Sequence, residues 1–503
     1  MPKPRLLCIS ASPRNPWPGP GQSGLVEAVR ELTTKDALME YISRQGDLCL
    51  EKFLEAGRKE GKSFNEIYAN LRRMTRSSGL SNSELALAAA LWSAVRSGAE
   101  VRHVPLSVHF PGEEGRVGMA ELRENLLWAD GVLISGPVYF GDRSSLVKSL
   151  QDFILEDARL RAAMRGKLYG GISVGAKRNG GQETTLIYQL VDMLEMGMLG
   201  VGNDSDTTAQ YGGTCHAGDV GTISRDASGL ETSMGVGRRM AKVLQLLASP
   251  RRLKAKPSAL VLLLQDAEGV GAGFVESMRG RLSGQLDLEV VDFTDARLRR
   301  CMACDICPAD VDVDESYRCL VKNDAMKGMH SRLLDHDMLV PVVVSVRDPG
   351  RISGDYQKFM ERTRYLRRGD YVWSDTLVAP VVIQEPGAVS TYPLRMLTSL
   401  IRHHTVMSRP LVGHLIQGGL PDQEELLVGL GEASAQAARL AAGRLAQALK
   451  GGGVGYNPVG YVLSADKNRD DAMFQKRSRI VAARGERLSR LAGDRLRPAS
   501  EEE

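Results

Sequence analysis

Four of the seven cysteines in this chain lie close together in the sequence, with the spacing C-x2-C-x2-C-x11-C. Three thiolates at intervals of three residues can bind one face of an iron–sulfur cube, and the fourth can return after a loop. A four-cysteine zinc site more often presents two separated C-x2-C pairs, so the spacing favours a cluster and leaves zinc as the alternative. The four residues are Cys301, Cys304, Cys307 and Cys319.

A second group of residues has the chemistry of a phosphate site that is split in two. Hydroxyl and guanidinium groups follow a strand-like run at residues 6–10, and small polar residues begin an amphipathic helix predicted for residues 82–98. A helix N-terminus offers unpaired N–H groups and a positive dipole, which suit a phosphate. A plain helix cap is the alternative for residues 81–83. The candidate phosphate residues are Ser10, Ser12, Arg14, Ser81, Asn82 and Ser83.

The two halves of this site are separated by a segment that we interpret as an insertion at about residues 25–76. Apolar residues recur in it at helical spacing, as at Leu38, Tyr41 and Ile42, and they predict two or three helices. A helical lid beside a bound ligand suits an enclosed substrate pocket.

Short apolar runs alternate with helical stretches twice along the chain, which is typical of doubly wound α/β domains. A basic, proline-containing join at residues 249–258 separates the two sets. We therefore predict one domain at 1–250, a second at 257–450, and a basic tail at 451–503, where mixed charges indicate a solvated helix. The predicted strands are 6–10, 99–106, 130–137 and 168–175, then 259–265, 286–293, 338–345, 377–384 and 410–417, and a helix is predicted at about 423–449.

Length and charge exclude several classes of protein. A chain of 503 residues is long enough for two hydrophobic cores. A formal net charge of +4 gives no reason to expect nucleic acid or an acidic membrane as the main partner. We see neither a membrane-spanning run nor a signal peptide in the sequence. The number of cysteines is odd and four of them are crowded together, which is typical of a reducing compartment. We therefore expect a cytoplasmic protein.

Three sequence blocks resemble the NADPH-dependent FMN reductase and iron-sulfur flavoprotein family, which has a flavodoxin-like fold. The first block is the split phosphate site, where Ser12-Pro13-Arg14 and Asn82-Ser83 resemble the phosphate loop of the family. The other two are SGPVYFGDRSSLVKSLQDF at 135–153 and SVGAKRNGGQETTLIYQLVDMLEMGMLGVG at 173–202. The resemblance covers most of residues 1–248 and implies an α/β chain of two tandem flavodoxin-like domains, each with a doubly wound parallel sheet.

The resemblance implies that FMN binds to the first domain. The second block would then lie beside the isoalloxazine ring, with Tyr139 and Phe140 either shaping the substrate pocket or packing in the core. Gly180 and Gly181 in the third block would let the backbone approach the flavin closely. The flavin contacts expected in these two blocks are Pro137, Val138, Tyr139, Phe140, Gly141, Gly175, Gly180 and Gly181.

The resemblance also implies a four-iron, four-sulfur cluster at the cysteine motif. The second domain looks like a degenerate copy of the fold, because its first loop at 265–274 has two acidic residues and no basic residue to meet a phosphate. We therefore expect one FMN in the first domain and one cluster in the second. Dimers of the resembled family can bring the cluster of one subunit near the flavin of its partner, so a homodimer of tandem chains is a further expectation.

These observations predict an FMN-dependent oxidoreductase that reduces an organic substrate such as a quinone, a nitro compound or a pathway intermediate, with the cluster as an electron relay. The electron donor is either NAD(P)H, as the resemblance implies, or a reduced ferredoxin, and the residues do not decide between them. The alternatives are an electron-transfer protein that docks a redox partner without transforming a small molecule, and a flavin reductase with a structural zinc site.

Overall fold

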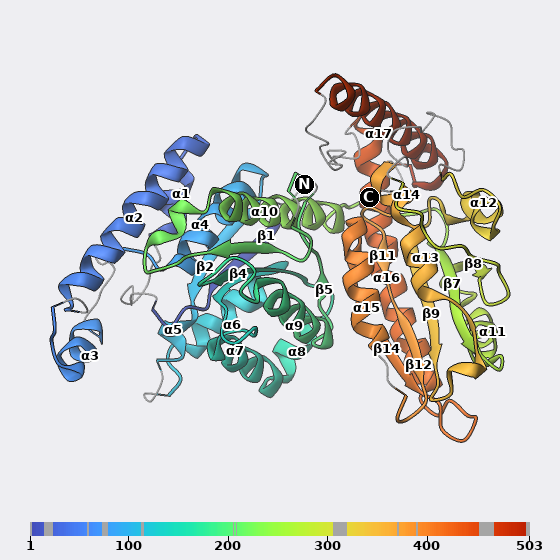
Figure 1. Cartoon of the computed structure of the whole chain (residues 1–503), viewed down its shortest axis with the longest axis horizontal. Helices are drawn as coiled ribbons and strands as arrows, with labels where there is room; N and C mark the ends of the chain where they lie inside the picture. The colour runs from blue at the N-terminus through green and yellow to red at the C-terminus, as the bar shows by residue number, and fades with distance from the viewer. Residues whose placement is uncertain are drawn as a thin grey trace. The chain divides into compact units, whose positions relative to one another are not determined.

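The structure is a computed structural model, which divides into two compact units, Pro2–Leu244 and Gln245–Glu503, with Met1 grouped with the second (Figure 1). Each unit is described by itself. The residues that the structure describes are 3–14, 24–57, 60–72, 79–111, 115–204, 206–207, 209–304, 319–369, 372–388, 391–451 and 467–498.

The first unit is built on a parallel sheet with the order β2-β1-β3-β4, and both β5 and β6 pair with the outer side of β4. This is the flavodoxin-like strand order. The four strands predicted for this unit are confirmed, whereas the short β5 and β6 were not predicted. The strands are β1 (Arg5–Ser10), β2 (Glu100–Pro105), β3 (Gly131–Pro137), β4 (Leu168–Gly175), β5 (Leu199–Gly200) and β6 (Gly213–His216).

Helices cover the sheet of the first unit (Figure 1). Helix α4 is buried along most of its length and contacts β1, β3 and β4, because its alanine-rich face lets it approach the sheet closely. Within its described residues, the insertion contains three helices, α1 to α3. The helices are α1 (Leu25–Glu31), α2 (Lys35–Glu55), α3 (Phe64–Arg72), α4 (Asn82–Arg96), α5 (Leu106–His109), α6 (Met119–Trp128), α7 (Ser145–Glu156), α8 (Ala158–Met164), α9 (Gln182–Glu195), η3 (Thr222–Arg225) and α10 (Ala227–Leu247).

The second unit repeats this strand order, with the parallel sequence β8-β7-β9-β12-β14 and a short antiparallel strand, β10, against β7. The predicted strand at 377–384 is interrupted at Pro380, which has no N–H for a sheet hydrogen bond. It therefore forms two short strands, β11 and β12. The strands are β7 (Ser258–Ala267), β8 (Asp287–Asp292), β9 (Met338–Ser345), β10 (Ile352–Gly354), β11 (Leu377–Val378), β12 (Val381–Gln384), β13 (Val406–Met407) and β14 (Leu411–His414).

The helices of the second unit include the predicted one at 423–449, which is confirmed as α16. Within the residues that the structure describes in both units, no helix has both the length and the apolar character needed to cross a bilayer. The helical segments are α11 (Val270–Leu282), α12 (Ala325–Met329), η4 (His330–Leu333), η5 (Pro349–Arg351), α13 (Tyr356–Arg362), α14 (Arg364–Gly369), α15 (Tyr392–Leu400), η6 (Ile401–His403), α16 (Gln423–Leu449) and α17 (Lys467–Arg495).

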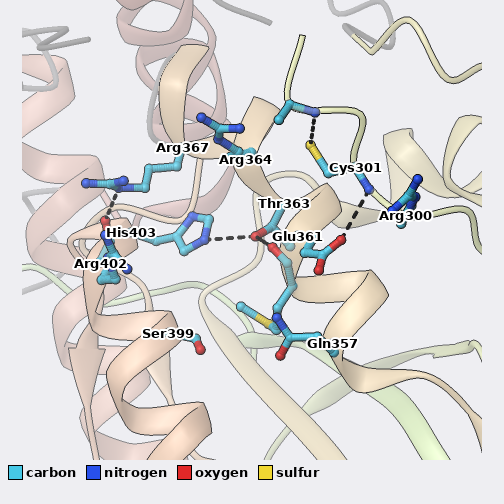
Figure 2. Close-up of a pocket in the computed structure, with 12 residues that line it drawn as sticks. Arg300, Cys301, Gln357, Glu361, Thr363, Arg364, Arg367, Ser399, Arg402 and His403 are labelled. Carbon is cyan, nitrogen blue, oxygen red and sulfur yellow. Dashed lines mark hydrogen bonds between the residues drawn. The ribbon is translucent and has the colours of Figure 1, made fainter. Parts of the chain in front are cut away.

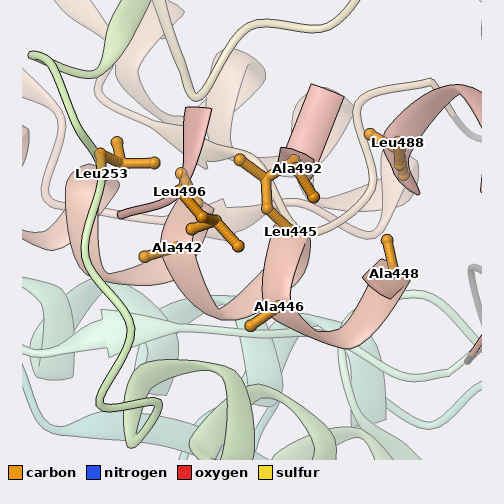
Figure 3. Packing of buried hydrophobic residues seen from close by; sticks show 9 residues of the cluster. Leu253, Ala442, Leu445, Ala446, Ala448, Leu488, Ala492 and Leu496 are labelled. Carbon is orange, nitrogen blue, oxygen red and sulfur yellow. The ribbon is translucent and has the colours of Figure 1, made fainter. Parts of the chain in front are cut away.

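The C-terminal helix α17 is not the solvated helix that its mixed charges predicted. Its second half packs against α16 through Leu488 and Ala492, and Leu496 just beyond its end joins the same buried cluster (Figure 3). These residues recur every four positions, so they share one face of the helix. The buried guanidinium of Arg484 also donates to the carbonyl of Val372. The apolar stripe is narrow and lies among many arginines, which is why the charge pattern hid it.

The carboxylate of Asp337, just before β9, joins three elements of the second unit. It is fully buried and accepts hydrogen bonds from the N–H of Ser258 at 2.9 Å and from the guanidinium of Arg444 at 3.1 Å. The guanidinium of Arg495 at the end of α17 donates to the same carboxylate, at 3.1 Å from Oδ1. One buried anion therefore ties β7, α16 and α17 together.

We expect the Asp337→Asn variant to be less stable by about 3–5 kcal/mol, because it leaves the charge of the buried Arg444 without its counter-ion. Thermal and denaturant unfolding of the full chain would measure the loss. The matched control is Glu276→Gln, which removes an exposed ion pair with Arg279 and should change stability by less than about 0.5 kcal/mol. Equal stability of the two variants would contradict the structural role given to Asp337.

Candidate functional site

Three loops of the first unit meet at one edge of its sheet. Strands β1, β3 and β4 are parallel neighbours, so the loops that follow Ser10, Pro137 and Gly175 leave the sheet on the same side. In open α/β sheets this carboxyl edge is the place where ligands bind. The three sequence blocks singled out above are therefore neighbours in space.

The two halves of the candidate phosphate site are joined through β3. The N–H of Ala11, just after β1, donates to the carbonyl of Ser135 at 2.8 Å. The hydroxyl of Ser135 donates in turn to the carbonyl of Ser83 in the first turn of α4, also at 2.8 Å. Ser135 lies opposite Ser10 in the sheet and is fully buried. The end of β1 and the start of α4 are thus held together across an insertion of three helices.

At the start of α4, the protein itself uses two of the predicted phosphate side chains. Ser81 forms a capping box with Glu84, in which each side chain accepts the backbone N–H of the other. Asn82 donates through Nδ2 to the carbonyl of Asp219 at 2.9 Å and accepts the N–H of Ile223 at 3.3 Å. The helix-cap reading therefore applies to Ser81. Its capping role puts a carboxylate near the proposed phosphate.

Some hydrogen-bond donors near the start of α4 nevertheless remain available to an anion. The backbone N–H groups of Asn82 and Ser83 have no acceptor among the residues that the structure describes. On the other side, Ser12 is nearly buried, and its hydroxyl oxygen accepts the N–H of Arg14 at 3.2 Å, which leaves the hydroxyl hydrogen free to donate. The exposed guanidinium of Arg14 lies 5.7 Å from the ring centre of Phe53 in α2.

The loop after β3 is a tight hairpin turn. Tyr139 and Asp142 exchange two backbone hydrogen bonds of 2.8 and 2.9 Å. Phe140 and Gly141 between them have φ angles of 52° and 79°, which is the pattern of a type I′ turn. A left-handed conformation is costly for phenylalanine. Phe140 is nevertheless fully exposed and Tyr139 is 45% exposed, so the alternative of core packing is wrong for Phe140.

The loop after β4 touches this turn, and glycine is required at the contact. Gly181 has a φ of +100°, and a Cβ atom there would lie 2.9 Å from the Cα of Gly141. A Cβ on Gly175 would lie 2.5 Å from Nε2 of Gln182, which donates to the carbonyl of Lys177 at 2.7 Å. Contacts within the protein thus account for Gly175 and Gly181, and close approach to a flavin remains a prediction.

Helix α2 of the insertion packs against the segment at 217–223. A Cβ on Gly46 would lie 2.3 Å from the carbonyl oxygen of Gly221, so the two backbones touch. Cys49 and Phe53 of α2 form a small buried cluster with Val220. The segment 217–223, which also bonds to Asn82, was missed by sequence reasoning. The glycines in HAGDVG were the available signal.

In the second unit, the corresponding loop after β7 is closed by its own carboxylate. The buried Asp266 accepts the N–H groups of Gly271 at 2.6 Å and Ala272 at 3.0 Å, in the first turn of α11. These are the groups that a phosphate would use at a helix N-terminus. The expectation that this loop disfavours a phosphate thus has a concrete structural reason.

The cysteine motif is described only in part. Cys307 lies outside the described residues, while Cys301 and Cys319 are half-buried and Cys304 is exposed. The sulfur of Cys301 accepts the N–H of Ala303 at 3.4 Å. Among the described residues no three His, Cys, Asp or Glu side chains gather as a metal site, so the ligand set remains a prediction.

We expect the Gly46→Ala variant to lose about 1–3 kcal/mol of stability, because its methyl group would force α2 away from Gly221. Thermal unfolding would measure the change. Gly218→Ala is a matched control in the adjoining loop, since a Cβ there meets nothing within 4 Å. A Gly46 variant as stable as the control would show that α2 is not packed as described.

Comparison with known proteins finds relatives of part of the first unit. Residues 67–207 match the family described as NADPH-dependent FMN reductase. An iron-sulfur flavoprotein of Methanocaldococcus jannaschii is 39% identical over 127 residues, which are 25% of this chain and 65% of the relative. A NAD(P)H dehydrogenase (quinone) of Caulobacter vibrioides is 29% identical over 130 residues, or 24% of this chain and 65% of the relative.

Among solved structures, a flavodoxin, WrbA-like protein of Agrobacterium tumefaciens aligns with 31% of this chain and 88% of its own length, at 22% identity and a TM-score of 0.24. The chain spans 65% of the length of the curated relatives it matches. The matched region contains α4 and the loops after β3 and β4, whose geometry is given above. Through its first unit, this chain is similar to the NADPH-dependent FMN reductase family and to iron-sulfur flavoproteins.

Proposed function

We propose that the chain is an FMN-dependent oxidoreductase that reduces an organic substrate with electrons from NAD(P)H or a reduced ferredoxin. The observation that carries this proposal is the meeting of three loops at the carboxyl edge of the first sheet, two of them within the part of the chain that matches FMN reductases. The substrate class we favour is a quinone, in line with the name of the Caulobacter relative, ahead of a nitro compound or a pathway intermediate.

The residues at this edge fit the phosphate and ring of FMN. Arg14, Ser12 and the N–H groups of Asn82 and Ser83 would bind the phosphate, because they combine one positive charge with several donors. The turn at 139–142 and the contact between Gly141 and Gly181 would flank the isoalloxazine ring. FMN, when bound, supplies the hydride and electron chemistry, so the protein groups named here bind and orient it.

Two features favour an enzyme over a protein that only carries electrons. Helix α2 lies over the loops beside Asn82, where it would cover one side of the ligand. The exposed, strained Phe140 offers an aromatic face for a planar substrate. We therefore propose a substrate pocket between the insertion and the turn at 139–142.

We further propose that Cys301, Cys304, Cys307 and Cys319 hold a four-iron, four-sulfur cluster. An all-thiol donor set with this spacing suits such a cluster. When bound, a cluster supplies one-electron transfer, which would make the second unit a relay. A structural zinc ion is the competing occupant, and the experiment on the cysteines below separates the two.

For Arg14→Gln, we expect the affinity for FMN to fall about tenfold or more, because one charge-assisted hydrogen bond to the phosphate is lost. Fluorescence titration with FMN and with riboflavin would measure it, and riboflavin, which has no phosphate, should bind both proteins alike. Arg159→Gln, an exposed arginine on α8, is the matched control. Unchanged FMN binding by the Arg14 variant would remove this residue from the site.

Chemical analysis of protein purified without oxygen should give about four iron and four sulfide per chain. Cys319→Ser should lower both and change the visible spectrum, because it removes a proposed ligand. Cys49→Ala, a cysteine of α2 outside the motif, should leave iron and sulfide unchanged. Zinc without sulfide in the parent protein would refute the cluster and make the site structural.

A further inference from the structure

A cavity of about 550 Å³ lies within the second unit (Figure 2). Its walls come from the segment that begins the cysteine motif, from helices α13 and α14, and from the end of α15 with η6. None of the residues proposed to hold FMN belongs to it. Among its twelve lining residues, the charged and imidazole side chains belong to Arg300, Glu361, Arg364, Arg367, Arg402 and His403.

The charge of this lining is strongly positive. Four of the twelve residues are arginines, and Glu361 is the single acidic member. That carboxylate already accepts the N–H of Cys301 at 3.3 Å. The exposed guanidinium groups of Arg300 and Arg402 form no ion pair with a carboxylate among the described residues. Like charges gathered in this way repel one another, and a bound anion would relieve the repulsion.

One residue that lines the cavity, His403, is buried and has a ring nitrogen with no hydrogen-bond partner among the described residues. His403 is 3% exposed and packs against Trp373, with 4.9 Å between ring centres. Its Nε2 lies 3.2 Å from the hydroxyl of Thr363, while Nδ1 has no partner in the described structure. Burial, together with the charges of Arg367 and Arg402, lowers the pKa of His403 to about 3, so the imidazole is neutral.

We propose that this cavity is a binding site for a small polyanion, either a phosphate ester or a di- or tricarboxylate. Guanidinium groups pair with carboxylate and phosphate oxygens through two parallel hydrogen bonds, and several arginines around one space call for more than one anionic group. The volume lies in the range of about 300–1,000 Å³ that is typical of small-molecule sites. The hydroxyls of Thr363 and Ser399 and the amide of Gln357 would meet the polar body of the ligand.

This site is separate from the flavin site in chemistry and in sequence. The flavin loops lie at the carboxyl edge of the first sheet, whereas this cavity is built from the helices of the second unit and from the start of the cysteine motif. An anion bound here would lie beside Cys301, in the unit proposed to relay electrons. The proposal does not depend on whether the motif holds iron or zinc.

Isothermal titration calorimetry of the full chain, saturated with FMN to fill the proposed phosphate site, tests the proposal with pyrophosphate and with citrate as probes. We expect at least one probe to bind, and the double variant Arg300→Gln, Arg402→Gln to bind it about tenfold or more weakly. Both arginines are exposed, so the variant should fold, which circular dichroism would check. Each single variant should show part of the loss.

Arg281→Gln, an exposed arginine of α11 that pairs with Glu424, is the matched control and should bind like the parent protein. Binding of pyrophosphate alone would identify phosphate esters as the ligand class, and binding of citrate alone would identify carboxylates. Binding of neither probe, or binding that the double variant leaves unchanged, would overturn the proposal. Because the readout is anion affinity, failure here is distinct from failure of the flavin assignment.

Discussion

The hydrogen bonds of Ser135 hold the candidate site of the first unit in one piece. Its carbonyl accepts the N–H of Ala11, and its hydroxyl donates to the carbonyl of Ser83, so a single buried residue of β3 joins β1 to α4. A buried hydroxyl that loses its partner costs free energy, and the pairing is therefore well determined. The link between β1 and α4 involves no residue of the insertion. The chain between Ser12 and Ser81 can therefore accommodate the three helices without breaking this link.

The helices α4 and α11 hold equivalent positions in the two units, but the backbone N–H groups at their N-termini differ in their acceptors. In the first, the backbone N–H groups of Asn82 and Ser83 at the start of α4 have no acceptor among the described residues. In the second, the carboxylate of Asp266 fills the start of α11 from within the protein. An internal anion satisfies the helix dipole of α11 without any ligand. The arginine-lined cavity of the second unit lies among its helices.

Sequence periodicity was sufficient for the long elements and failed for the short ones. Buried runs such as Leu168–Gly175 and Met338–Ser345 are continuous, and their strands were predicted closely. Strand β5 has two residues and β13 has two, which is too short for any pattern to emerge. The strand at 377–384 was divided by Pro380, and the apolar face of α17 was hidden among arginines. Local pattern cannot reveal which of several charges is buried against a distant partner such as Asp337.

For the candidate site, the positions of the loops could be predicted from the sequence, whereas the roles of single side chains could not. The positions of the three loops followed from their strands, because neighbouring parallel strands must end at one edge. The roles of single side chains did not follow: Ser81 caps α4, Asn82 bonds to the loop at 219–223, and Gly181 meets Gly141. The cavity lined by Arg300, Arg402 and His403 draws on segments about a hundred residues apart, so only the folded chain brings it to notice.

The insertion lies in the chain between β1 and α4, the two elements that we propose to bind the flavin phosphate. The entropy of closing a loop grows slowly with its length, by about 0.6 kcal/mol for each doubling, so helices of quite different length could be exchanged there without remaking the sheet. Helix α2 contacts the segment at 217–223 that binds Asn82, and its Phe53 ring lies 5.7 Å from the guanidinium of Arg14, so each exchange would also alter the surroundings of the proposed phosphate site. The insertion and the proposed phosphate site would therefore have to change together in this chain.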